Sequence, residues 1–321
     1  MFDSQNYELF LKKIEQKREI NRVGNSVGGV MLISSGLTLI LNIVTAIVLQ
    51  ILSKTTLLND AGFQLILQLA FSTLIFTLPM ILLPLFTGDN FNEVFLLKKV
   101  PTVTCTQLIF IGFGVIALSN IGNNIFASIL SSFGMTPVGY EFDLPSGFFG
   151  TFLVFLSGAL APALVEEFAL RGMVLGVVKK HFGNGPAILV SSIIFSLMHG
   201  NLQQIPFALL LGLYLGYITV YTGSILPAVI LHFANNFISF ALDLITTNLG
   251  PTASNLITIL YFVIVLCIGL FGVIWFAQSN NSFEIKCGQT KKFTLGIIKT
   301  PAMIVYIITI AIQVIITQLG A

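Results

Sequence analysis

Long runs of apolar residues alternate along the chain with short polar segments. Most runs approach or exceed about 20 residues, the length that a helix needs to cross the hydrocarbon core of a bilayer. The pattern predicts membrane-spanning helices at residues 29–53, 61–86, 104–133, 148–178, 186–200, 203–222, 224–247, 254–277 and 300–319. The run at 186–200 is short, so we expect it to be partly re-entrant or buried by its neighbours. The expected fold is an all-α, polytopic transmembrane helix bundle of about eight to nine spans.

The composition favours the same class of protein. Hydrophobic residues make up 55% of the 321 positions and charged residues only 9%, whereas a soluble domain carries about 25% charged residues. The net charge of +2 gives no indication of nucleic-acid binding. The three cysteines lie far apart and form no metal-ligand spacing. We therefore expect an integral membrane protein that has the lipid bilayer, and no nucleic acid, among its partners.

Lysine and arginine residues between the apolar runs predict the orientation in the membrane. They precede the first run, follow the second and the fourth, and separate the eighth from the ninth, at Lys12, Lys13, Lys17, Arg18, Arg22, Lys98, Lys99, Lys179, Lys180, Lys286, Lys291, Lys292 and Lys299. With the N-terminus in the cytosol all of these residues lie on the cytosolic side, as the positive-inside rule requires, and Lys54 is the exception. The amphipathic segment 1–28 is expected either on the membrane surface or as a solvated helix before the first span.

Five ionisable residues fall inside or beside the apolar runs, where charge is costly and marks a functional site: Glu166, Glu167, Arg171, His199 and His232. Glu167 and Arg171 are four residues apart, so they share one helix face and can form an ion pair. Glu166 lies about 100° around the helix and has no partner there. Because a carboxylate in apolar surroundings can exchange protons near neutral pH, Glu166 is the candidate general base, and Glu167 and Arg171 are its support.

The two histidines belong to later runs, and each has a notable residue one helical turn away. Phe195 precedes His199, and Asn236 follows His232. Two imidazoles and a carboxylate could hold zinc, with Glu166, His199 and His232 as ligands and one position left for water. The same residues could act without a metal if Glu166 activates water and Asn236 or His232 stabilises the oxyanion. The residue types leave both mechanisms equally open.

Buried glutamate and histidine also serve functions other than hydrolysis. A proton-coupled transporter would use them as a relay, and a non-enzymatic immunity or scaffold protein would use them to join helices. The polar interruptions "GNNIF" at 122–126 and "DLITTN" at 243–248 are of the kind that transport paths contain. The chain lacks the repeated halves that many transporters show, which favours an enzyme.

Three motifs occur in order on separate runs: "EEFALR" (166–171), "FSLMH" (195–199) and "HFANN" (232–236). They match EExxxR, FxxxH and HxxxN, and over roughly residues 105–250 the chain resembles the CPBP family of CAAX prenyl proteases and bacteriocin-processing or Abi-type immunity proteins. The resemblance implies a cytosol-facing cavity open to the lipid. The resemblance also implies that Glu166 is the catalytic carboxylate and that His199, His232 and Asn236 complete the site. It gives Glu167, Arg171 and Phe195 supporting roles.

The motifs and the resemblance together predict an intramembrane endopeptidase. Its substrate would be a membrane-associated or lipidated peptide or protein, such as a bacteriocin leader. We expect it in a bacterial plasma membrane, with the active site near the cytosolic face. The expected parts of the chain are a cytosolic segment (1–28), N-terminal transmembrane helices (29–104), a catalytic helix core (105–250) and C-terminal transmembrane helices (251–321).

Overall fold

The computed structural model describes residues 4–51, 61–135, 147–247, 249–279 and 281–319. These residues form an all-α bundle, as predicted, and their only β-type pairing is an isolated bridge between Leu97 and Ser224. Eight of the described helices are long and apolar enough to cross a membrane. The count lies within the predicted range and leaves out the short run near residue 190.

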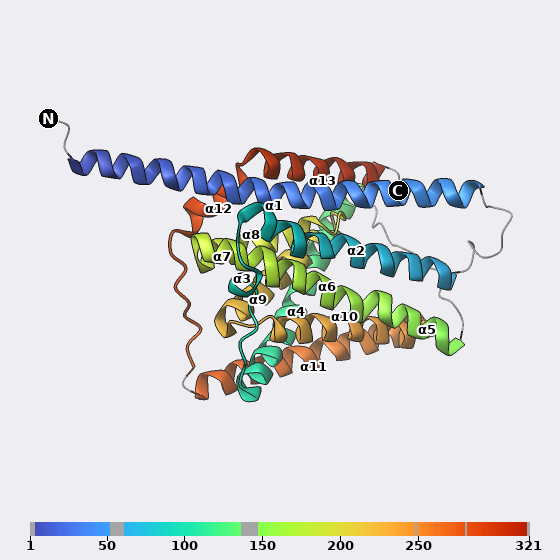
Figure 1. Cartoon of the computed structure of the whole chain (residues 1–321). Helices are drawn as coiled ribbons and strands as arrows, with labels where there is room; N and C mark the ends of the chain where they lie inside the picture. Colours follow the sequence, from blue (N-terminus) through green and yellow to red (C-terminus); the bar gives the residue numbers. More distant parts are fainter. Residues whose placement is uncertain (1–3, 52–60, 136–146, 248, 280, 320–321) are drawn as a thin grey trace.

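The bounds of the elements follow the apolar runs closely (Figure 1). They are α1 (Ser4–Ile51), α2 (Ala61–Thr87), α3 (Phe91–Val94), α4 (Thr102–Ser132), α5 (Gly147–Phe155), the π-helix η2 (Leu156–Leu160), α6 (Ala161–Glu167), the π-helix η3 (Phe168–Val174), α7 (Leu175–Phe182), α8 (Asn184–Leu197), α9 (Ile205–Thr222), α10 (Leu226–Thr246), α11 (Pro251–Gln278), α12 (Thr290–Ile298) and α13 (Pro301–Leu319). The elements from α5 to α7 follow one another without a break and form a single span.

Helix α1 is one continuous helix of 48 residues, and its N-terminal part projects beyond the rest of the bundle (Figure 1). At 1.5 Å per residue it is about 70 Å long, more than twice the thickness of the hydrocarbon core. It therefore runs straight through residue 28, where the sequence predicted a boundary between two parts of the chain. The N-terminal segment extends the first span and is not a separate helix folded back along the membrane surface.

Helix α8 corresponds to the short apolar run and is buried, as one of the two expectations for it stated. It packs against α7, α9 and α12, and its 14 residues measure about 21 Å, too short for a complete span. Gly183 at its start has a φ of +87°, which lets the chain turn sharply from α7 into α8. Gly200, just after its end, has a φ of +61°.

Helices α4 and α11 pack closely at a pair of glycines. A Cβ atom added to Gly269 would lie 2.4 Å from the Cα atom of Gly114, so neither position has room for a larger side chain. Contacts between small residues of this kind let the backbones of membrane helices approach one another, and van der Waals packing then holds the helices together.

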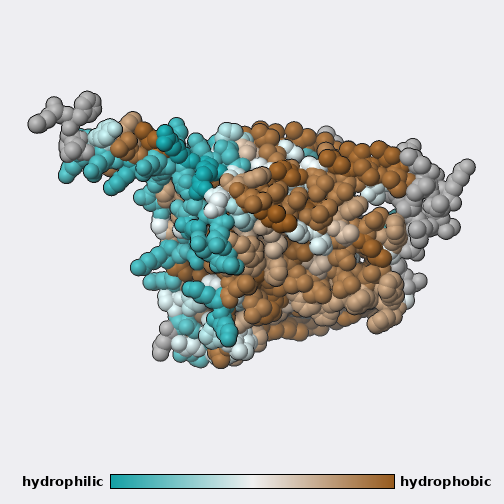
Figure 2. Space-filling model, in the orientation of Figure 1, coloured by the Kyte–Doolittle hydropathy of each residue, from teal (hydrophilic) through white to brown (hydrophobic). Residues whose placement is uncertain are grey.

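Hydrophilic residues gather at one end of the bundle, whereas the rest of the visible surface is apolar (Figure 2). The hydrophilic end contains the N-terminal part of α1 together with α3, α12 and the end of α7 (Figures 1 and 2). Members of the predicted basic clusters lie at this end. Lys180 donates a hydrogen bond to Glu93, and Lys292 donates one to Gln16. This grouping agrees with the expectation that the clusters share one side of the membrane.

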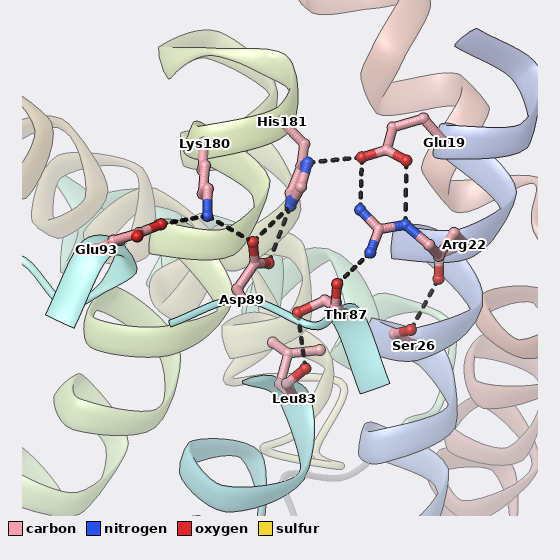
Figure 3. A network of polar contacts seen from close by, with 9 residues as sticks. All are labelled: Glu19, Arg22, Ser26, Leu83, Thr87, Asp89, Glu93, Lys180 and His181. Atoms are coloured by element: carbon pink, nitrogen blue, oxygen red, sulfur yellow. Dashed lines mark hydrogen bonds and ion pairs between the residues drawn. The ribbon is translucent and has the colours of Figure 1, made fainter. Parts of the chain in front are cut away.

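A network of ion pairs connects α1, the segment after α2, and α7 at this hydrophilic end (Figure 3). The ring of His181 lies between two carboxylates, with Nδ1 2.7 Å from Glu19 Oε1 and Nε2 2.9 Å from Asp89 Oδ2. Lys180 Nζ also contacts Asp89, at 2.9 Å. The sequence placed His181 at a helix end but did not indicate these partners.

Burial of Asp89 acts to raise its pKa, but the hydrogen bonds from Lys180, His181 and Thr87 outweigh that effect and lower the pKa to about 2. Its side chain is only 4% exposed. Arg22 adds a further tie, because it pairs with Glu19 at 2.7 Å and donates a hydrogen bond to the backbone of Thr87. The extension of α1 is thereby fixed to the helix that carries the predicted catalytic residues.

Candidate active site

The two adjacent glutamates lie where regular helix changes to π-helix. Glu167 is the last residue of α6, and η3 begins at Phe168. A π-turn adds a residue to the helical repeat and often marks a functional site. The motif spacing predicted regular α-helix here and did not indicate this change.

Glu167 is the centre of a buried polar cluster. Its side chain is fully buried, and Oε1 accepts hydrogen bonds from Arg171 Nη1 at 2.8 Å and from His232 Nδ1 at 2.9 Å. The ion pair predicted from the sequence is present. The bond to His232 joins α6 to α10 and was not predicted. A buried charge is tolerated only when it is paired and hydrogen-bonded, and Arg171 and His232 provide both.

Arg171 is also completely buried and has two further contacts. Its Nη2 donates to the backbone oxygen of Gly212 on α9 at 3.3 Å, and its guanidinium lies 4.3 Å from the ring centroid of Phe195 on α8. A Cβ atom at position 212 would lie only 3.1 Å from the Phe195 ring, so glycine lets α9 come this close. Arg171 therefore ties α9 and α8 to the helix that carries the glutamates.

Phe195 connects the two histidines. Its ring packs edge-on against the rings of His199 and His232, with centroid distances of 5.0 and 5.6 Å. Its backbone oxygen accepts a hydrogen bond from His199 Nδ1 at 2.7 Å. Since a carbonyl and a carboxylate only accept hydrogen bonds, both histidines carry a proton on Nδ1 in this arrangement. In the neutral ring, Nε2 is then the free acceptor.

Glu166 is half-buried and differs from its neighbour in having no fixed partner. Its Oε2 atom is inaccessible and makes no hydrogen bond to any described residue. The carboxylate still lies within electrostatic range of Arg171. A buried polar atom without a partner is rare in proteins and often belongs to a functional site. Glu166 thus has the unpartnered state that the sequence predicted for a general base.

Asn236 lies one turn after His232 on α10, and its neighbour Asn235 orients it. The Asn235 amide donates to Asn236 Oδ1 at 3.0 Å, which leaves the amide hydrogens of Asn236 available as donors. Asn235 is buried. Asn235 has no counterpart in the HxxxN pattern and was therefore not among the predicted site residues. The adjacent pair "NN" was the available signal, since one amide can orient another.

The predicted zinc ligands do not assemble into a metal-binding set. Within the described ranges, no group of three or more His, Cys, Asp or Glu side chains is arranged to hold a metal ion. Nδ1 of His199 and His232 is already hydrogen-bonded to protein atoms. These bonds leave Nε2 of each ring as the atom that could bind a metal. Zinc binding by Glu166, His199 and His232 stays a prediction.

The cluster combines residues from three separate helical segments. Glu167, Arg171, Phe195, His199 and His232 contact one another in turn. Two further predicted residues are Glu166 on α6, next to Glu167, and Asn236 on α10, one turn after His232. Within the described structure neither makes a hydrogen bond to the five residues of the cluster. The arrangement offers a free carboxylate, two imidazole acceptors and an amide donor, which are the groups that water-mediated hydrolysis requires.

Comparison with known proteins identifies the family of this region. Residues 148–238 match the family model described as Type II CAAX prenyl endopeptidase Rce1-like. No curated protein and no solved structure matched the chain. The matched residues are fewer than the predicted 105–250, but they contain all three motifs and every residue of the cluster. Residues 148–238 are therefore similar to the Rce1-like type II CAAX prenyl endopeptidases, and this match supports the resemblance to the CPBP family that the motifs indicate.

Proposed function

We propose that this protein hydrolyses a peptide bond of a membrane-associated or lipidated peptide or protein, with a water molecule activated by Glu166. The observation that carries the proposal is the fully buried Glu167–Arg171 ion pair, hydrogen-bonded to His232 inside the transmembrane bundle. Charges are rare inside membrane-spanning segments because they are costly there. Helix association alone explains them poorly, because polar contacts between membrane helices contribute only about 0.6 kcal/mol on average.

Glu167 acts in this proposal as a positioning residue. It accepts the hydrogen bond from Nδ1 of His232, as carboxylates do for catalytic histidines elsewhere, and Arg171 pairs with the same carboxylate. Nε2 of His232 and Nε2 of His199 then accept hydrogen bonds and orient the attacking water. Phe195 fixes the relative position of the two rings.

The chemical step uses the free carboxylate of Glu166. Glu166 takes a proton from water as the water oxygen bonds to the carbonyl carbon of the substrate. The amide hydrogens of Asn236 stabilise the oxyanion that forms. When the carbon–nitrogen bond breaks, Glu166 returns the proton to the leaving amine, so the enzyme ends in its starting state.

The orientation in the membrane is part of the proposal. The positive-inside rule assigns the hydrophilic end of the bundle to the cytosol. Glu166 precedes Lys179 by 13 residues along α6, η3 and α7, which is about 20 Å at most. A substrate would reach the site from the cytosolic half of the bilayer.

Substitution of each glutamate in the purified protein tests the proposal. The assay follows cleavage of a fluorogenic peptide that carries a farnesylated or palmitoylated cysteine, in lipid vesicles. Glu166→Gln should abolish cleavage and leave thermal stability unchanged, because Glu166 has no partner to lose. Glu93→Gln, at an exposed position in the hydrophilic network, is the matched control and should remain active. Full activity of Glu166→Gln would refute the assignment of the base.

A further inference from the structure

The segment between α3 and α4, residues 95–101, lies at the hydrophilic end of the bundle (Figures 1 and 2). Its first residue, Phe95, packs edge-on against Phe168 at a centroid distance of 5.6 Å. A Cβ atom at Gly172, the residue after Arg171, would lie 2.2 Å from the Phe95 ring, so glycine lets the segment come this close. The segment is therefore held against the span that carries the predicted catalytic glutamates.

The same segment pairs with the turn between α9 and α10 through a short antiparallel bridge. Two backbone hydrogen bonds join them, from Lys98 N to Gly223 O at 3.1 Å and from Ile225 N to Leu96 O at 3.0 Å. Leu97 lies opposite Ser224, between these two bonds. In such a pair the N–H and C=O groups of the two central residues point away from each other, toward the outer edges of the bridge.

The two outer edges differ in whether their backbone groups have partners. On one edge, Ser224 N donates to Thr222 Oγ1 at 3.2 Å, and Ser224 O lies 3.1 Å from the same hydroxyl. On the other edge, the N–H and C=O of Leu97 have no hydrogen-bond partner among the described residues, and the Leu97 side chain is 66% exposed. An exposed edge with a free donor and a free acceptor is a place where another extended chain can pair.

Two lysines without an ionic partner lie beside this edge. The side chain of Lys98 runs past Gly223, where an added Cβ atom would lie 2.8 Å from Lys98 Cδ. Lys98 is also within electrostatic range of Lys179, at the end of α7. Within the described ranges neither lysine forms an ion pair, whereas the adjacent Lys180 has two carboxylate partners. Like charges at close range repel each other, so the pair favours an anionic ligand.

The free backbone groups at Leu97 distinguish between two kinds of anionic ligand. A lipid phosphate only accepts hydrogen bonds, so it would pair with the lysines and with the Leu97 N–H but leave the C=O without a donor. An extended peptide presents N–H and C=O groups at the spacing of a strand edge and pairs with both. Lysines on an edge also discourage pairing with most other strands, so the charge selects an acidic segment.

The edge is close enough to the catalytic residues for one substrate to reach both. Ile225, which pairs with the α3–α4 segment, precedes His232 by seven residues at the start of α10, or about 10 Å. Gly172, under the Phe95 ring, follows Glu166 by six residues, or about 9 Å. At about 3.3 Å per residue, roughly three to four extended residues cover these distances.

We propose that the backbone edge at Leu97, with Lys98 and Lys179 beside it, binds an extended acidic segment of the substrate as an added strand. The inference rests on the proposed protease function. The segment's backbone exchanges hydrogen bonds with Leu97, and its carboxylates pair with the two lysines. The bound segment thus holds a peptide bond about four residues away near Glu166, so the substrate preference is for acidic residues on the hydrophilic side of the cleaved bond.

Binding of three fluorescent peptides to the full chain tests the inference. The chain carries Glu166→Gln to prevent cleavage and is held in nanodiscs of phosphatidylcholine, which has no net charge. One peptide alternates valine with glutamate, the second has lysine in place of glutamate, and the third is the acidic peptide with alternate backbone amides N-methylated. Fluorescence anisotropy should show about tenfold tighter binding of the acidic peptide than of the basic one. N-methylation should weaken binding about tenfold, because it removes the donors that a strand partner needs.

Charge variants of the protein test the role of the lysines. Lys98→Gln/Lys179→Gln should lose the preference for the acidic peptide. The matched control Lys12→Gln/Lys13→Gln lowers the net charge equally at exposed positions on the projecting part of α1 and should keep the preference. If the preference persists in the first variant, or if the acidic and basic peptides bind equally to the parent chain, the inference fails.

A proline substitution tests the backbone edge itself. Leu97→Pro removes the outward N–H and leaves the two inward hydrogen bonds of Leu96 and Lys98 in place. It should weaken binding of the acidic peptide several-fold, whereas Leu97→Ala, which keeps the N–H, should not. If Leu97→Pro does not fold, the N-methylated peptide gives the same information on the intact chain. Equal binding of the N-methylated and unmodified peptides would show that no strand is added, and would overturn the proposal.

Nanodiscs that contain phosphatidylglycerol test the alternative occupant. The acidic peptide should still bind more tightly than its N-methylated form, because both forms carry the same charge and meet the same surface potential. Loss of that difference in the anionic lipid would show that headgroups occupy the lysines and the edge, and would overturn the proposal.

The two proposals can fail separately. If the acidic peptide binds with these preferences while the parent chain never cleaves a lipidated substrate that contains the same acidic segment, the protease function fails. If the parent chain cleaves lipidated substrates with acidic and basic segments at equal kcat/KM, and Lys98→Gln/Lys179→Gln does the same, the protease function stands and the inference about the edge fails.

Discussion

The buried ion pair makes a sharp prediction about stability, because removal of one member alone should cost more free energy of unfolding than removal of both. Arg171→Met removes the positive charge and leaves the Glu167 carboxylate buried, with a single hydrogen bond from His232. At about 4 Å between charge centres and an effective dielectric constant of 20, the lost attraction is about 4 kcal/mol. Removal of one partner of a buried pair typically costs 3–5 kcal/mol, so we expect a loss of about 4 kcal/mol.

The double variant Glu167→Gln/Arg171→Met should recover most of that loss. A glutamine oxygen still accepts the hydrogen bond from His232, and no uncompensated charge remains in the bundle. Stability is measured as the free energy of unfolding in mixed detergent micelles as the fraction of denaturing detergent rises, with helical circular dichroism as the signal. Proteolytic activity should be low in both variants, because Arg171→Met removes the residue that holds the Glu167 carboxylate and the double variant also removes the carboxylate that orients His232.

The stabilities of Arg171→Met and of the double variant, each compared with the parent protein, test whether the ion pair acts through charge. If Arg171→Met is as stable as the parent protein, the pair does not hold the helices together. If the double variant is as unstable as Arg171→Met, the penalty comes from lost packing against Phe195 and not from the stranded charge. Either result would refute the electrostatic reasoning.

Three further predictions follow from other parts of the bundle. Gly269→Val should destabilise the protein by about 2–3 kcal/mol in the same unfolding assay, because its side chain would collide with the backbone at Gly114; unchanged stability would contradict the close helix contact. Asp89 has a pKa lowered from 3.8 to about 2 in the folded protein, so its carboxylate contributes stability above about pH 4 that is lost as the pH falls toward 2. Allowing for solvent screening, Asp89→Asn should cost about 1 kcal/mol at pH 6 and almost nothing near pH 2, and an equal cost at both pH values would contradict this. Elemental analysis should find the same low zinc content in the parent protein and in the His199→Ala/His232→Ala variant, and cleavage should survive a chelator; one zinc per chain that the variant loses would instead support the metal mechanism.

The helical architecture could be predicted because apolar length is a direct consequence of the bilayer. Span by span, the predicted limits agree with the helices to within a few residues over most of the chain. The division at residue 28 stays a prediction, because a change from polar to apolar composition reports where a helix enters the membrane, not where it ends. Helix α1 continues through that point.

The cluster was only partly predictable for a related reason. The Glu167–Arg171 pair lies within one helix, where spacing determines contact, and it could be predicted directly. The bond from His232 to Glu167 joins residues 65 positions apart, and its existence depends on how the bundle packs. The ties from Arg171 to Gly212 and to Phe195 are of the same kind. Sequence spacing carries no information about such contacts.

The three motifs share a spacing of four residues, yet the structure uses that spacing differently each time. In "EEFALR" it pairs two side chains, Glu167 and Arg171, on one helix face. In "FSLMH" it brings the His199 ring to the backbone oxygen of Phe195, so the phenylalanine contributes a carbonyl as well as a ring. In "HFANN" it places an amide one turn beyond His232.

In our proposal the groups that keep a free donor or acceptor carry the chemistry, and the residues bonded to their neighbours hold them in place. Glu166 has no partner, whereas Glu167 has two. Asn236 keeps its amide hydrogens free because Asn235 occupies its oxygen. This division explains why the glutamates occur as an adjacent pair: one carboxylate must remain free to exchange a proton, and the other must stay charged to orient a histidine. A chain with a single glutamate at this position could perform only one of these two tasks.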